Sequence, residues 1–162
     1  MNLNPYAPPQ ANVSDHGDVA NMPALWNPRA AANWSLLFSP AFGAWVHMEN
    51  WKALGEPAQA AVSKAWVYGS AGFLLLVTIL SLAFGDSKAL DSLARLFGFG
   101  MLLAWYFAHG RVQQQQVEAR FGSSYPRKGW AKPLFFAFVG VSAFLGLVFA
   151  AAYMQVTVSG EG

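Results

Sequence analysis

The chain has 162 residues, of which 55% are hydrophobic and only 11% are charged, and its net charge is +2. A typical soluble domain carries roughly 25% charged residues, so this composition excludes an ordinary soluble domain and indicates an integral membrane protein. The absence of cysteine excludes disulfides and thiolate metal sites. The weak net charge, without a basic face, argues against nucleic-acid binding.

The first 30 residues predict a disordered, proline-rich tail. The leader NPYAPPQANVSDHGD combines three prolines with small and polar residues, a composition that favours extended or polyproline conformations and cannot bury a core. A docking motif built around Tyr6 is the alternative to a simple solvated leader. No basic stretch precedes an apolar core here, so a cleaved signal peptide is not expected.

Residues 31–48 form the first apolar segment, and two structures fit it. As one helix it is about 27 Å long, which is marginal for a span, and Pro40 would kink it. Alternatively the segment re-enters or lies at the membrane interface. Small or polar groups recur at intervals of four residues, a stripe that membrane helices use for close packing. The candidate helix-packing or partner-docking face is Ser35, Ser39, Gly43 and His47.

Three further segments complete a predicted transmembrane domain over residues 31–154. About twenty apolar residues cross the hydrocarbon core of a bilayer, and two of the segments have no charge over that length. The third segment, residues 93–110, crosses the bilayer if the Arg95 side chain extends so that its charge reaches the membrane surface. Pro57 suits the first turn of the helix leading into the second segment. The expected spans are about 31–48, 65–84, 93–110 and 134–154, followed by a short C-terminal tail, 155–162.

The loop between the third and fourth segments holds half of the ten Lys and Arg residues. Short loops rich in Lys and Arg stay cytoplasmic, which places this loop inside and the C-terminus outside. We expect a helix to continue from the third segment to Gly122, with its four glutamines as a solvated turn. Four spans put both termini outside, whereas three spans put the N-terminal tail inside. Basic residues here are candidate contacts for anionic lipid headgroups, each contributing roughly 1 kcal/mol: Arg120, Arg127, Lys128 and Lys132.

Few side chains suggest chemistry. His47 and His109 are expected at the same inner interface, with Glu49 nearby, and two imidazoles with a carboxylate can bind a divalent cation. They lack a ligand spacing such as HExxH, however, so interfacial histidines are the simpler interpretation. We predict no catalytic residues, no metal site and no cofactor, and we expect a non-enzymatic protein.

Four stretches, NPYAPPQA, WSLLFSPAFGAW, NWKALGEP and ARFGSSYPRKGWAKPL, together resemble a group of small bacterial inner-membrane proteins that share no established activity. The resemblance implies a multi-pass helical bundle in the bacterial inner membrane. Some small polytopic proteins of this type are immunity proteins against membrane-acting toxins of contact-dependent secretion systems.

The expected fold is therefore an all-α polytopic membrane bundle of four transmembrane helices, or of three plus a re-entrant or interfacial segment. The expected function is a non-enzymatic interaction within the bilayer, most concretely immunity against a pore-forming toxin by helix docking. The partners are then the lipid bilayer and a membrane-inserting toxin. The alternative is an accessory subunit of a channel or transporter, whose partner is another membrane subunit. No segment carries a central charge, which argues against a transporter acting alone.

Overall fold

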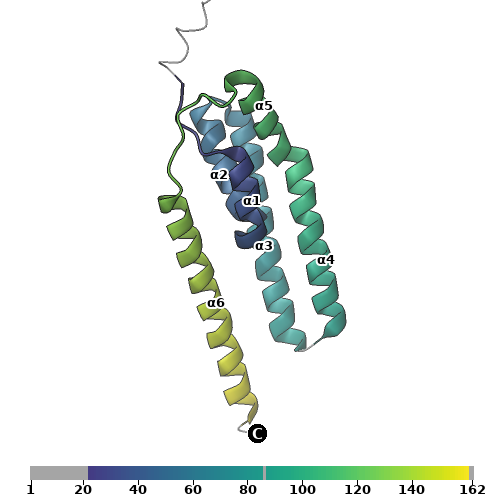
Figure 1. The fold of residues 1–162 in the computed structure, drawn as a ribbon. Coiled ribbons are helices and arrows are strands. Elements are labelled where there is room, and N and C mark those ends of the chain that lie inside the picture. The colour runs from purple at the N-terminus through teal and green to yellow at the C-terminus, as the bar shows by residue number, and fades with distance from the viewer. Residues whose placement is uncertain (1–21, 86, 161–162) are drawn as a thin grey trace, which may run out of the picture.

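The computed structural model describes residues 22–85 and 87–160, and within them the chain is helical apart from turns, loops and one isolated β-bridge. The all-α class is thereby confirmed. The expected tail over residues 1–21, including the Tyr6 motif, lies outside the described residues. In chain order the helices are α1 (Pro28–Phe38), α2 (Pro40–Ala53), α3 (Pro57–Phe84), α4 (Lys88–Trp105), the π-helical turn η3 (Tyr106–Gly110), α5 (Arg111–Phe121) and α6 (Ala131–Gly160) (Figure 1).

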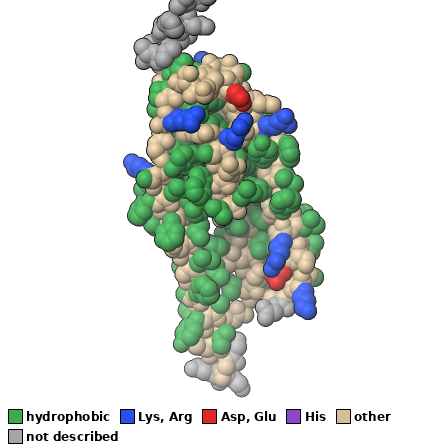
Figure 2. Space-filling model, viewed as in Figure 1, with side chains coloured by type: hydrophobic (Ala, Val, Ile, Leu, Met, Phe, Trp, Pro, Cys, Tyr) green, Lys and Arg blue, Asp and Glu red, His purple; other side chains and the backbone are tan. Residues whose placement is uncertain are grey.

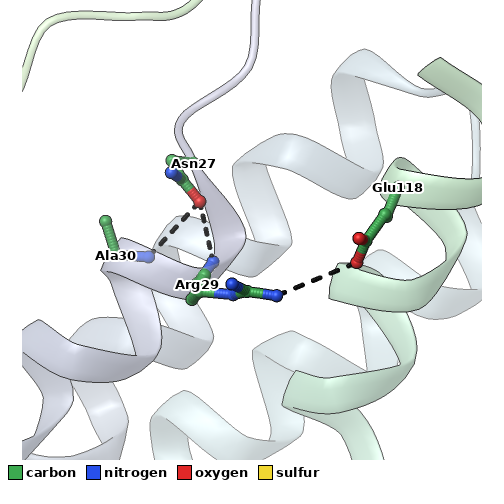
Figure 3. A network of polar contacts seen from close by, with 4 residues as sticks. All are labelled: Asn27, Arg29, Ala30 and Glu118. Carbon is green, nitrogen blue, oxygen red and sulfur yellow. Dashed lines mark hydrogen bonds and ion pairs between the residues drawn. The ribbon is translucent and has the colours of Figure 1, made fainter. Parts of the chain in front are cut away.

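Prolines set where three of the helices begin. Pro28, Pro40 and Pro57 each occupy the first turn of their helix, where the missing N–H would be unpaired anyway and the fixed φ suits the helix. The start expected at Pro57 is confirmed. Asn27 caps α1, because its Oδ1 accepts hydrogen bonds from the backbone N–H of Arg29 at 3.0 Å and of the next residue at 3.4 Å (Figure 3).

Helices α1 and α2 form an antiparallel hairpin, so the expected single kinked helix over 31–48 is wrong. A proline disfavours helical geometry in the residue before it, and Ser39 adopts φ 95° and ψ 161° between the two helices. The chain then reverses, which brings His47 Nε2 to 3.3 Å from the carbonyl oxygen of Pro28. With 11 and 14 residues, the helices are about 17 and 21 Å long.

Neither hairpin helix reaches across the roughly 30 Å hydrocarbon core of a bilayer. The count of four transmembrane helices is therefore not confirmed. Two other helices, α3 and α6, are long and apolar enough to cross a membrane. They contain the expected spans 65–84 and 134–154.

The expected third span, 93–110, lies within α4 and η3, which continue into α5 without a break (Figure 1). Helix α5 is followed by Gly122 at φ 57°, as expected from the sequence. The outer boundaries differ from expectation: the folded part includes residues 22–30, and α6 extends to Gly160. Residues 161–162 lie outside the described residues.

The first described residues are hydrogen-bonded to the loop between α5 and α6, residues 122–130, which we call the basic loop. Leu25 is fully buried, its N–H donates to Pro126 O at 3.0 Å, and its carbonyl accepts from the N–H of Lys128 at 2.8 Å. Leu25 packs there with Val117 and Tyr125. The beginning of α1 and the basic loop therefore lie at the same end of the molecule, which we call the α5 end. Helix α6 leads away from this end, beside the other helices (Figure 1).

Candidate functional site

Buried polar side chains gather where α2, α3 and the continuous helix α4–η3–α5 meet. Each is at most 3% exposed. Their spacing is helical on two of the elements: three and four residues apart on α2, and four apart along α4–η3–α5. We call this set the polar cluster, and its members are His47, Asn50, Trp51, Ser63, Trp105, His109 and Gln113.

Gln113 joins α5 to α2. Its Nε2 donates to the backbone carbonyl of His47 at 2.9 Å, and its Oε1 accepts from Asn50 Nδ2 at 3.2 Å. Asn50 in turn holds the segment before α1: its Nδ2 donates to Trp26 O at 2.8 Å, and its Oδ1 accepts from Trp26 N at 3.0 Å. Two buried amides thus fasten three separate segments at the α5 end.

His109 lies in the π-helical turn η3 and faces α2 and α3. Trp51 Nε1 donates to His109 Nε2 at 3.2 Å, and Ser63 Oγ also contacts this nitrogen. An indole N–H only donates, so Nε2 accepts, and the ring is neutral with its proton on Nδ1. A serine beside a histidine resembles a nucleophile and its base. Here, however, the indole occupies the base nitrogen, and Ser63 is fully buried.

The four residues of the predicted packing face occupy different places in the hairpin. Ser35 on α1 and Gly43 on α2 oppose each other, and Trp105 of α4 lies against them: a Cβ on Gly43 would overlap Ser35 Oγ and lie 2.5 Å from Trp105 Cη2. Ser39 forms the turn. His47 is fully buried, its Nε2 donates to the Pro28 carbonyl, and its ring meets Trp105 edge-on at 5.3 Å between centroids. Ser35, Gly43 and His47 thus pack against this chain itself.

Three of the basic residues proposed as lipid contacts, Arg120, Arg127 and Lys128, lie in α5 or in the loop that follows it, and Lys and Arg side chains gather at this end in Figure 2. Lys128 Nζ lies 4.3 Å from the centre of the Trp26 ring. Arg127 lies over Tyr125, 5.7 Å from the ring centre. Burial raises the pKa of the Tyr125 hydroxyl, and the positive charge of Arg127 partly opposes that shift. Lys132 lies in the first turn of α6 beside Pro133, and Arg120 lies in the last turn of α5.

An ion pair links α1 to α5 at the same end. Arg29 Nη2 lies 3.9 Å from Glu118 Oε2 (Figure 3). Both side chains are more than 70% exposed, so this pair contributes little to stability. The two helices are held instead by the buried contacts of Leu25 and of the polar cluster.

The interpretation of the four glutamines as a solvated turn is wrong for Gln113. Its side chain is fully buried, whereas Gln115 two residues on is exposed. The signal was present in the sequence as spacing, because Trp105, His109 and Gln113 follow one another at intervals of four and so share a helix face.

Within residues 22–85 and 87–160, no three His, Asp or Glu side chains gather in a way that could hold a metal ion. Glu49, which sequence placed near His47, instead pairs with Lys52 at 2.7 Å. Comparison of the chain with protein-family models, with curated proteins and with solved structures found no match.

Proposed function

We propose that this chain is an integral protein of the bacterial inner membrane, with α3, α6 and the helix formed by α4 and η3 as its spans. A helix in the core of a soluble protein would be mostly buried, but only 6% and 0% of the most apolar windows of α3 and α6 are buried. Figure 2 shows Lys and Arg side chains at two levels with a mainly apolar band between them. Such a band suits lipid and would be insoluble in water.

The span formed by α4 and η3 has a shorter apolar stretch than α3 and α6. The fifteen residues between Arg95 and Arg111 cover about 23 Å, so Arg95 has to reach the interface along its methylene groups. With three spans, the basic loop is cytoplasmic by its charge. The N-terminal tail is then cytoplasmic too, because Leu25 is bonded to that loop, and the C-terminus is outside.

Single cysteines provide a test of this topology, because the natural chain has none. We expect a membrane-impermeant maleimide added to intact spheroplasts to label Ser87→Cys, which joins α3 to α4, but not Ser123→Cys in the basic loop. Ala24→Cys should also stay unlabelled until the cells are lysed. Labelling of Ala24→Cys in intact spheroplasts, with Ser123→Cys protected, would show that residues 31–48 cross the membrane after all.

Within the bilayer we propose a non-enzymatic role in which α6 docks a helix of another membrane protein. The observation that carries this proposal is that α6 packs little against the rest of the chain. Its main contacts are with α1 and α3, and both are among the smallest contacts between helices in the described residues. The side of α6 that carries Ser142 has large exposed side chains at helical spacing around this small residue: Phe138, Leu145 and Phe149. Membrane helices pack through such surfaces by van der Waals contact.

The most concrete form of this role is immunity: α6 would bind a membrane-inserting toxin and block its pore. This form predicts that deleting the gene sensitises cells to siblings that deliver a toxin encoded beside it. In a growth competition, we expect wild type to restore survival and the double variant Phe138→Ala/Leu145→Ala to fail. The control double variant Phe97→Ala/Phe107→Ala removes exposed rings from α4 and η3 and should restore survival. Equal survival of the deletion strain and wild type would refute immunity.

An accessory subunit of a channel or transporter is the alternative. It requires polar groups along a path through the apolar band. Among the described residues, most hydrogen-bonded buried side chains instead gather at the α5 end, where they bond one another and the backbone. Ser35, nearer the hairpin turn, bonds a carbonyl of its own helix. The immunity role is therefore the one that we favour.

A further inference from the structure

An apolar cavity separates α6 from the rest of the molecule. It has a volume of about 520 Å³ and is bounded by the tip of the α1–α2 hairpin, by α3 and by one side of α6. Its walls include Trp45, Leu74, Phe136 and Phe144, and among all its lining residues in the described chain Ser39 alone has a polar side chain. Since the cavity lies beside the proposed spans, this inference rests on the membrane placement proposed above.

The dimensions of the cavity indicate what fills it. Along α6 it runs from Pro133 to Phe144, about 17 Å at the helical rise, close to the roughly 15 Å of one bilayer leaflet. The lining along this whole length is apolar apart from Ser39. A hollow of this length with apolar walls suits one extended hydrocarbon chain lying in that leaflet.

The rim of the cavity at the α5 end is aromatic and cationic. Trp45 lines the cavity and packs on Trp26 with 6.0 Å between ring centroids, and Lys128 Nζ lies 4.3 Å from the Trp26 ring centre. On the opposite wall, Lys132 directly precedes Pro133, which lines the cavity. Tryptophans mark the headgroup level of a membrane, and lysines there attract anionic headgroups.

We propose that this cavity binds one acyl chain of an anionic phospholipid, with the phosphate held between Lys128 and Lys132. Charge complementarity at the rim, the apolar walls and the leaflet-length depth point to the same occupant. The lipid would complete the packing of α6, which the protein leaves unfilled on this side. It also leaves the outward face of α6 free, so lipid binding and partner docking use different surfaces.

Native mass spectrometry of the detergent-purified full chain, with added phosphatidylglycerol or phosphatidylcholine, tests the proposal. We expect one phosphatidylglycerol to be retained in preference to phosphatidylcholine. Gly140→Leu should lower its retention about ten-fold, because Gly140 lines the cavity and open space surrounds its missing side chain. Gly146→Leu is the matched control, since this position on α6 is equally open but lies off the cavity, and it should retain lipid like wild type.

The charges are tested separately. Lys128→Gln and Lys132→Gln should each reduce the preference for phosphatidylglycerol about five-fold. Lys88→Gln removes the same charge from the start of α4 and should leave the preference unchanged. Equal retention of both lipids by wild type, or unchanged retention by Gly140→Leu, would overturn the proposal. So would a dimer that Gly140→Leu abolishes while lipid retention persists, because the cavity would then be a helix interface. None of these readouts depends on toxin immunity.

Discussion

Replacing Gly43 by alanine is expected to lower the unfolding midpoint of the detergent-purified protein by roughly 6–12 °C, equivalent to about 3 kcal/mol. The added Cβ would overlap Ser35 Oγ and lie 2.5 Å from Trp105 Cη2, far inside van der Waals contact. Trp105 is fully buried, so its ring cannot turn aside without disturbing the hairpin and α4 together. Far-ultraviolet circular dichroism, followed during heating, measures the midpoint.

Gly69→Ala is the matched control for this substitution. Gly69 lies inside α3, and a Cβ there meets nothing within 4 Å. Both variants gain the same intrinsic preference of alanine for a helix, about 1 kcal/mol, so the difference between them isolates the overlap at Gly43. A midpoint for Gly43→Ala equal to or above that of Gly69→Ala would contradict the close packing of the hairpin against α4.

Composition and charge were sufficient to predict the long helices. The uncharged stretches of α3 and α6 are mainly apolar, and a helix is the structure in which a single stretch pairs all of its own backbone groups in lipid. Local signals also set some boundaries, since Pro57 begins α3 and Gly122 follows α5. These predictions held because each depends on residues close in the sequence.

The hairpin was not predictable in the same way. The stretch 31–48 is equally apolar whether Pro40 kinks a helix or ends one, and the outcome depends on Ser39, whose backbone adopts φ 95°. Few residues other than glycine adopt this region without support from the surrounding structure. The hairpin as a whole packs against α3 and α4, and the stretch 31–48 does not reveal those contacts on its own. The residues predicted to line one face of a single helix therefore lie on two helices, with Ser35 of α1 facing Gly43 of α2.

The polar cluster depends on the same long-range packing. In the sequence, Gln113 is one of four consecutive glutamines. In the structure, its hydrogen bonds to α2 distinguish it from Gln115. Histidines expected at a wet interface became buried for the same reason. The spacing of Trp105, His109 and Gln113 indicated a shared helix face, but it did not indicate which element would cover that face.

The second large effect is expected at Gln113. Gln113→Leu keeps much of the side-chain volume but leaves the His47 carbonyl and one N–H of Asn50 without their partner in the cluster. The buried Asn50 N–H is then unpaired, which costs about 1–3 kcal/mol, and the lost bond to the His47 carbonyl costs about 1 kcal/mol more. We therefore expect a total near 3 kcal/mol and a midpoint lowered by roughly 6–12 °C. Thermal unfolding in detergent measures this change, with Gln115→Leu as the control.

Gln115 is exposed and belongs to the same run, so Gln115→Leu should stay within about 0.5 kcal/mol of wild type. A double-mutant cycle with Asn50→Ala separates the cluster from simple loss of helix packing. Because Asn50 and Gln113 share a hydrogen bond, the double variant Asn50→Ala/Gln113→Leu should lose less stability than the two single variants together. Strict additivity, or equal midpoints for Gln113→Leu and Gln115→Leu, would mean that these amides do not fasten the hairpin to α5.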